Sequence, residues 1–167
     1  YARPDFPRIE PYVEKIKKDL GLSVWIDLER LEAGDAWQAA INKNLAASRV
    51  VVVFLSAQSL TSAAVLHELK TAIAQKKPIV PIYIQPVYGR TPPEWDDVRR
   101  FLSSIQHIEL KEFGGGDGWL DVLGAALKKL DVPALRRRRF REGAGRRSAR
   151  IPSLSRLTLA ELQSMPK

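Results

Sequence analysis

The sequence predicts an α/β fold in which helices cover a central parallel sheet. Apolar runs of strand length alternate with segments whose apolar residues recur at helical spacing, and the connections between them are short. Such β–α–β units give parallel strands and place ligands at the carboxyl ends of those strands. The chain has 167 residues, 45% of them hydrophobic and 28% charged. That length allows one domain with a full core and leaves little room for two.

The N-terminal part predicts a helix followed by a short strand. The helix presents one apolar face, formed by Ile9, Tyr12, Val13, Ile16 and Leu20. Pro7 and Pro11 lie near its start, and Gly21 follows its end, where a left-handed C-cap favours glycine. Residues 22–26 then predict a strand, and Trp25 at an inward position of that strand is expected to pack in the core.

A second helix and a second strand follow. Asp35 is suited to cap a helix whose apolar face is formed by Trp37, Ala40, Ile41 and Leu45. Residues 50–55 are all apolar and mostly β-branched, without alternation. A run of this kind is typical of a strand buried on both faces of a parallel sheet. We therefore expect it at the centre of the sheet.

The remaining part of the expected domain continues the alternation. Ser62 begins a helix that extends to about residue 75 and buries Val65, Leu66, Leu69, Ala72 and Ile73. The strand at residues 79–84 contains Pro81, whose missing backbone donor predicts a bulge or an edge position. A helix at residues 95–102 and a weaker strand at residues 106–110 follow. The last helix buries Trp119, Val122, Leu123, Ala126, Leu127 and Leu130. Four strands are thus expected.

The net charge of +8 lies in the C-terminal part of the chain. Residues 136–167 hold ten basic and two acidic side chains, whereas residues 1–135 hold 17 of each sign. We therefore expect a globular domain over residues 1–132 and an Arg-rich linker or tail over residues 133–167, which could lead into a further domain. Nucleic acid is not an expected partner except through this tail.

Composition excludes several classes of protein. Cysteine is absent and only two histidines occur, so a disulfide framework, a cysteine nucleophile and a metal site are not expected. No apolar run approaches the roughly 20 residues of a membrane helix, and no membrane partner is expected. A reducing cytoplasm fits these features. Because the first residue is Tyr1 and not Met, we expect the chain to be part of a larger protein.

Three possible catalytic patterns fail on their spacing. The His67-Glu68 pair would begin a metalloprotease motif, but Thr71 occupies the position of the second histidine. The glycine-rich residues 114–118 lack the Lys-Ser/Thr pair of a phosphate loop and predict a flexible turn. Ser56 follows an apolar strand without the glycines of a nucleophile elbow.

An ordered set of short motifs resembles the TIR family, the Toll/interleukin-1 receptor fold that also occurs in NAD-cleaving enzymes. The set covers most of residues 1–130 and comprises Gly21-Leu22-Ser23-Val24-Trp25-Ile26-Asp27, Leu31-Glu32-Ala33-Gly34-Asp35, Trp37, Ile41, Ser48, Leu55-Ser56, Ser62, His67-Glu68-Leu69, Ala72 and Lys77-Pro78-Ile79-Val80-Pro81-Ile82. Each piece alone is weak, but their order and spacing together are specific.

The resemblance implies a flavodoxin-like three-layer fold. Residues 1–5 resemble the end of the family's first strand and the loop that follows it. That strand is therefore apparently missing from the chain, and in the family it is a central one.

The resemblance also implies that Glu68 is the catalytic residue of an enzyme that cleaves nicotinamide from NAD, with NAD as substrate and no metal. A carboxylate near the ribose can stabilise an oxocarbenium-like transition state, as carboxylates do in glycoside hydrolysis. From Glu68 alone, a solvated helix glutamate paired with nearby lysines is the competing interpretation.

Five further residues are implied in binding NAD. Tyr1 and Arg3 would lie at the floor of the pocket, with Arg3 near the phosphates, although an exposed arginine needs no such role. Asp27 would orient the mobile loop that contains Gly34 as a hinge, or simply cap a turn. Trp37 would stack on a ring of the dinucleotide or pack in the core.

Two interpretations of function remain open. One is an enzyme of immune or antiphage defence that is activated by self-association through TIR–TIR contacts. The other is a non-catalytic signalling or scaffold module that uses the loop at residues 31–35. The second is kept open by Ala64 and Val65, because the family often places Trp and Cys at these positions beside the catalytic glutamate.

Overall fold

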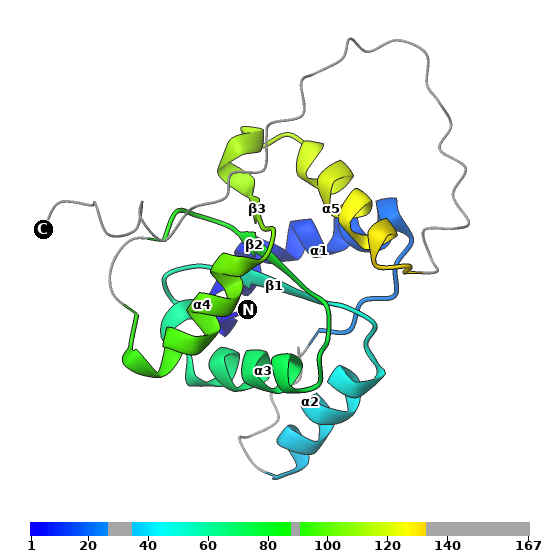
Figure 1. Ribbon diagram of the computed structural model, residues 1–167. Coiled ribbons are helices and arrows are strands. Elements are labelled where there is room, and N and C mark those ends of the chain that lie inside the picture. The colour runs from blue at the N-terminus through cyan, green and yellow to red at the C-terminus, as the bar shows by residue number, and fades with distance from the viewer. Residues whose placement is uncertain (27–34, 88–90, 133–167) are drawn as a thin grey trace, which may run out of the picture.

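The computed structural model describes residues 1–26, 35–87 and 91–132, and of residues 35–38 it describes the backbone alone (Figure 1). The helices are α1 (Phe6–Leu20), α2 (Asp35–Ala47), α3 (Ala63–Ala74), α4 (Asp96–Ser104) and α5 (Gly118–Lys129). The strands are β1 (Val51–Leu55), β2 (Ile79–Tyr83) and β3 (Ile108–Glu109). Short 3-10 turns precede α1, α3, α4 and α5, at η1 (Arg3–Asp5), η2 (Ser59–Thr61), η3 (Pro93–Trp95) and η4 (Leu110–Phe113).

The three strands form a parallel sheet in the order β1-β2-β3. Val51 pairs with Ile79 at one end of the β1–β2 ladder and Leu55 with Tyr83 at the other. Helices α2, α3 and α4 lie on one face of the sheet, and α1 and α5 lie on the other (Figure 1). The predicted α/β class with a parallel sheet in three layers is therefore confirmed.

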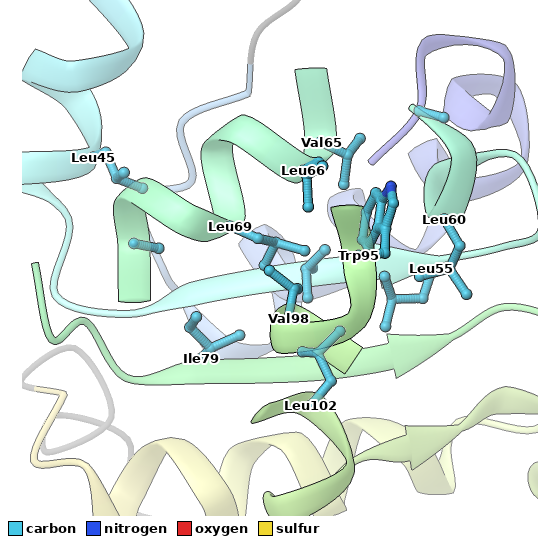
Figure 2. Packing of buried hydrophobic residues seen from close by; sticks show 13 residues of the cluster. Leu45, Leu55, Leu60, Val65, Leu66, Leu69, Ile79, Trp95, Val98 and Leu102 are labelled. Atoms are coloured by element: carbon cyan, nitrogen blue, oxygen red, sulfur yellow. The ribbon is translucent and has the colours of Figure 1, made fainter. Parts of the chain in front are cut away.

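The core on the α3 side of the sheet is built around two elements, α3 and the turn before α4. Ser62 caps α3 because its hydroxyl accepts a hydrogen bond from the Val65 amide at 3.4 Å. The helix then buries the face predicted from its spacing, except that Ile73 is only partly buried. Trp95 is fully buried and lies among side chains of α3 and β1, as Figure 2 shows.

The core on the opposite face joins α1 and α5 to the sheet. Helix α1 contributes Ile9, Val13 and Ile16, and α5 contributes Trp119, Leu120, Leu123 and Leu127. Gly21 ends α1 with φ of 63°, the left-handed conformation that glycine adopts at low cost. Leu130 was expected to be buried with α5, but it lies at the C-cap of the helix and is exposed.

Two expectations about the strands are wrong. Residues 22–26 form no strand, and in the sheet that the described residues form, β1 lies at an edge and not at the centre. The Val51 amide donates to Pro78 and the Leu55 carbonyl accepts from Ile84, so alternate backbone groups of β1 face β2. The groups of residues 50, 52 and 54 face the other way, toward a cavity that also touches residues 22–26. None of the described residues pairs with this edge of β1.

Pro81 lies in the central strand, so the predicted bulge or edge position is also wrong. It pairs with Val53 in an unbroken ladder. Because the Ile84 amide donates to β1, the amides of alternate residues of β2 face β1, and the nitrogen of Pro81 faces β3. Pairing with β3 begins only at Ile82 and Ile108. The missing donor of Pro81 therefore falls before the start of that ladder and costs no strand hydrogen bond.

Candidate functional site

The carboxyl end of β1 is where the candidate site is built. Ser56 follows the strand directly and is fully buried, and η2 and the capping residue Ser62 then lead into α3. Glu68 lies in the second turn of α3, on a half-buried position. The N-terminal segment reaches the same place, because the carboxylate of Asp5 accepts a hydrogen bond of 2.6 Å from the Ser56 hydroxyl. The N-terminal segment, the carboxyl end of β1 and the start of α3 thus meet at one edge of the sheet. Ligands of α/β folds bind at this edge.

Glu68 lines a cavity of about 1110 Å³. From the N-terminal segment the cavity is lined by Tyr1 and Arg3, and from the start of α3 by Ser62 and Ala64. Tyr1, Arg3 and Glu68, which the sequence placed in one site, are therefore brought together. Ala64 is exposed and lines the cavity one helical turn before Glu68, so its small side chain leaves that wall open.

The cavity has two ends of different chemistry. One end carries Glu68, Arg3, Gln58 and Ser62, all capable of hydrogen bonding. The other end lies between α1, α5 and the edge of β1 that no described residue pairs with, and most of its walls are apolar, with Ile9, Val13, Ile16, Val52, Phe54 and Leu127. Asn44, Ser48 and Arg49 add polar groups to the remaining lining. The volume describes both ends together, so it exceeds the space that a ligand beside Glu68 would occupy.

Charges near the polar end act on one another. The carboxylates of Glu68 and Asp5 both act electrostatically on the backbone nitrogen of Tyr1. Each of these carboxylates therefore lies close enough to Tyr1 to influence it. The polar end of the cavity therefore combines the negative charge of Glu68 with the positive charge of Arg3.

The other predicted binding residues are not placed together by the structure. Asp27 and Gly34 lie outside the described residues, and Trp37 belongs to α2 with its side chain outside them. Trp25 was expected in the core, but its side chain is 48% exposed and lines the cavity. The expectation fails because residues 22–26 have no strand partner to bury them.

Sequence reasoning assigned no role to two residues at the site, Asp5 and Ser59. Both are fully buried polar residues that hydrogen-bond with Ser56. The sequence did contain a signal for the serines, because Ser56 and Ser59 closely follow an apolar strand and ligands bind at the carboxyl ends of such strands. Partners 51 positions apart, such as Asp5 and Ser56, cannot be paired by spacing alone.

A second polar cluster lies at the carboxyl ends of β2 and β3. The ring of Tyr83 meets His107 edge-on with centroids 5.2 Å apart, and His107 and Lys111 both approach the carboxylate of Glu109. Burial raises the pKa of the Tyr83 hydroxyl, the charge of Glu109 raises it further, and Arg99 lowers it. None of these residues lines the cavity that contains Glu68.

Comparison with known proteins identifies the family. Within residues 1–26, 35–87 and 91–132, no helix combines the length and apolar character needed to cross a membrane. A search of curated proteins finds no match to the chain. The sequence profile of the TIR domain matches residues 1–128, which include every described helix and strand up to α5. The chain therefore belongs to the TIR domain family.

Proposed function

We propose that this TIR domain cleaves the bond between nicotinamide and ribose in NAD, with Glu68 as the catalytic residue. The observation that supports it is the position of Glu68, half-buried at the wall of a cavity that Tyr1 and Arg3 line from the opposite segment. The TIR family includes NAD-cleaving enzymes, and the residue that matches their glutamate is the one that faces the cavity.

Cleavage of the nicotinamide–ribose bond requires a negative charge at the right position and no strong nucleophile. Nicotinamide departs as a neutral molecule from a positively charged pyridinium, so the bonding electrons leave with it and positive charge grows on the ribose. The carboxylate of Glu68 stabilises that charge and hydrogen-bonds the ribose hydroxyls. Water then attacks the ribose carbon to give ADP-ribose and one proton, or a group of the same molecule attacks to give a cyclic product. No metal takes part in this scheme.

The remaining contacts belong to the same proposal. Arg3 meets the phosphates, Tyr1 lines the floor, and Asp27, Gly34 and Trp37 complete the site from the loop before α2 and from its first turn. Self-association through TIR–TIR contacts activates the enzyme, in an immune or antiphage defence effector whose other domains sense the trigger.

To test this proposal, the purified chain is incubated with NAD, and the nicotinamide that is released is measured by chromatography. Glu68→Gln keeps the size of the side chain and removes its charge, so we expect turnover to fall by roughly 10²-fold or more. Glu112→Gln is the matched control, because Glu112 is exposed in η4 and does not line the cavity. Equal turnover in the wild type and Glu68→Gln would remove Glu68 from the catalytic role.

A signalling module without catalysis is the alternative, and the exposed Ala64 favours it. The family often places a tryptophan at this position, where a ring would narrow the cavity beside Glu68. A scaffold would assemble with rising concentration and leave NAD intact, even when forced into oligomers by a fused oligomerising domain. NAD loss in the assembled state that Glu68→Gln abolishes would exclude this alternative.

A further inference from the structure

Among the described residues, the fully buried polar side chains are Asp5, Ser56 and Ser59, and they form one hydrogen-bonded network. The Ser56 hydroxyl donates to the Asp5 carboxylate at 2.6 Å and accepts from the Ser59 amide at 3.0 Å. The Ser59 hydroxyl accepts from the Ser56 amide at 2.7 Å and donates to the Ser56 carbonyl at 2.9 Å. Both hydroxyls therefore use their donor as well as their acceptor capacity.

The network joins two walls of the candidate site. On one side, Asp5 ends η1, the turn that follows Tyr1 and includes the cavity-lining Arg3. On the other side, Ser59 begins η2, which ends one residue before the cap of α3. The hydroxyl of Ser56 is the link between them. A shift of Asp5 relative to Ser59 would therefore change the position of Arg3 relative to Glu68 in the cavity lining.

Asp5 is the N-cap residue of α1, where a negative charge is favourable, but its carboxylate makes no capping hydrogen bond and accepts from Ser56 instead. Asp5 is only 2% exposed, and moving a carboxylate out of water is unfavourable unless several partners replace the lost hydration. Apolar residues of similar volume often serve a core as well or better than a buried charge. Buried polar networks that are fully satisfied instead fix one geometry, which is what a site needs from the residues behind it.

We propose that Asp5 is a positioning residue, which holds the N-terminal wall of the site against the start of α3 through the Ser56 hydroxyl. It acts through Ser56 and Ser59 and does not touch the substrate. The catalytic consequence rests on the proposed NAD cleavage, whereas the mechanical link between the two walls does not. The two parts can therefore be tested separately.

The substitutions follow from the hydrogen bonds. Asp5→Ala removes the acceptor that Ser56 uses and leaves its hydroxyl without that partner. Asp5→Asn keeps an acceptor oxygen at the same distance from the backbone and removes the charge. Leu123→Ala is the control for lost stability, because Leu123 is fully buried on α5 in the core of the opposite sheet face.

The first measurement is amide hydrogen exchange in the absence of NAD. In Asp5→Ala we expect faster exchange at residues 1–13 and 56–70 together, with residues 108–129 unchanged and Asp5→Asn close to the wild type. Leu123→Ala should instead accelerate exchange at residues 108–129 and in α1, which packs in the same core, and leave residues 56–70 unchanged. Equal acceleration of all three segments in Asp5→Ala, or acceleration of residues 1–13 alone, would overturn the link.

The second measurement is the kinetics of nicotinamide release. A displacement of about 1 Å can cost roughly 10²-fold in rate, so kcat of Asp5→Ala should fall by about that factor with a smaller change in KM, and Asp5→Asn should restore most of it. Leu123→Ala should keep kcat at temperatures where it is folded. An unchanged kcat in Asp5→Ala would overturn the catalytic part. Should the wild type itself leave NAD intact, the proposed function fails, and the exchange data still decide whether Asp5 couples the walls.

Discussion

Individual side chains at the end of β1 differ in how far sequence alone could place them. Glu68 could be assigned to a cavity wall because a family motif fixes its position, and the structure places it there. Asp5 lies in the same region, yet its partner Ser56 is 51 positions away. Such pairings depend on the path of the chain in three dimensions, which local spacing does not determine. Trp25 was misplaced for a related reason, since its burial needed a neighbouring strand.

The pKa of Tyr83 leads to a prediction about alkaline stability. Its ordinary value is 10.0 and burial raises it in the fold, so the unfolded chain loses the phenolic proton first as pH rises. The stability contributed by the neutral hydroxyl is therefore complete below pH 10 and is lost as pH climbs through the higher folded value. In Tyr83→Phe, the decrease in stability that the ionisation of Tyr83 causes above pH 10 should disappear.

Urea denaturation at several pH values from 8 upward checks the effect. Above pH 10, the unfolding free energy of the wild type should fall more steeply than that of Tyr83→Phe. A pH-independent difference would show that the phenol titrates alike in both states. Tyr12→Phe is a suitable control, because Tyr12 is also half-buried but lies on α1 against Phe54 and Trp119.

At the level of elements, periodicity predicted the helices well because each needs only its own residues and one apolar face. The faces of α3 and α5 were assigned from spacing and largely agree with the burial observed. Strands depended on partners that the pattern does not name. Residues 50–55 have the composition of a central strand, but the position of a strand in a sheet is set by what lies beside it. The same dependence explains the errors at residues 22–26 and at Pro81.

The end of α1 gives a prediction for an element boundary. Gly21 has φ of 63°, and a Cβ added there would meet no atom within 4 Å. Gly21→Ala is therefore free of clashes and tests backbone conformation alone, at a cost of about 1 kcal/mol in unfolding free energy. Gly21→Asn should cost less, because asparagine tolerates the left-handed region.

Equilibrium urea denaturation of both variants measures these costs. Gly118→Ala makes a contrasting control, since its added Cβ would lie 3.0 Å from the side chain of Phe113 and its effect would be steric. A loss in Gly21→Asn as large as in Gly21→Ala would mean that the glycine serves something other than the turn.

For the molecule as a whole, the apolar end of the cavity lies beside the edge of β1 that no described residue pairs with. Backbone groups of residues 50, 52 and 54 face it, and apolar side chains of α1 and α5 close it. We expect an extended peptide of about five β-branched residues to bind there as an added strand. At a peptide concentration about 100 times its Kd, the unfolding free energy should rise by about 2.7 kcal/mol.

Thermal unfolding at increasing peptide concentration measures this binding. The control peptide carries proline at its centre, which removes a ladder donor while keeping the apolar character. Equal stabilisation by both peptides would indicate that the cavity takes up apolar molecules without forming a strand. Binding should leave Glu68 and Arg3 accessible, because they line the cavity from α3 and the N-terminal segment and not from the edge of β1.

The free edge of β1 also bears on how association of this chain is to be judged. Two molecules at high concentration can join such edges into a shared sheet, because their backbone groups are available to a second chain. The charge of Arg49, directly before β1, works against this joining. Oligomers detected by sedimentation would then reflect pairing between the β1 edges of two molecules. Assembly that persists when a peptide occupies the edge of β1 would instead indicate TIR–TIR contacts at another surface.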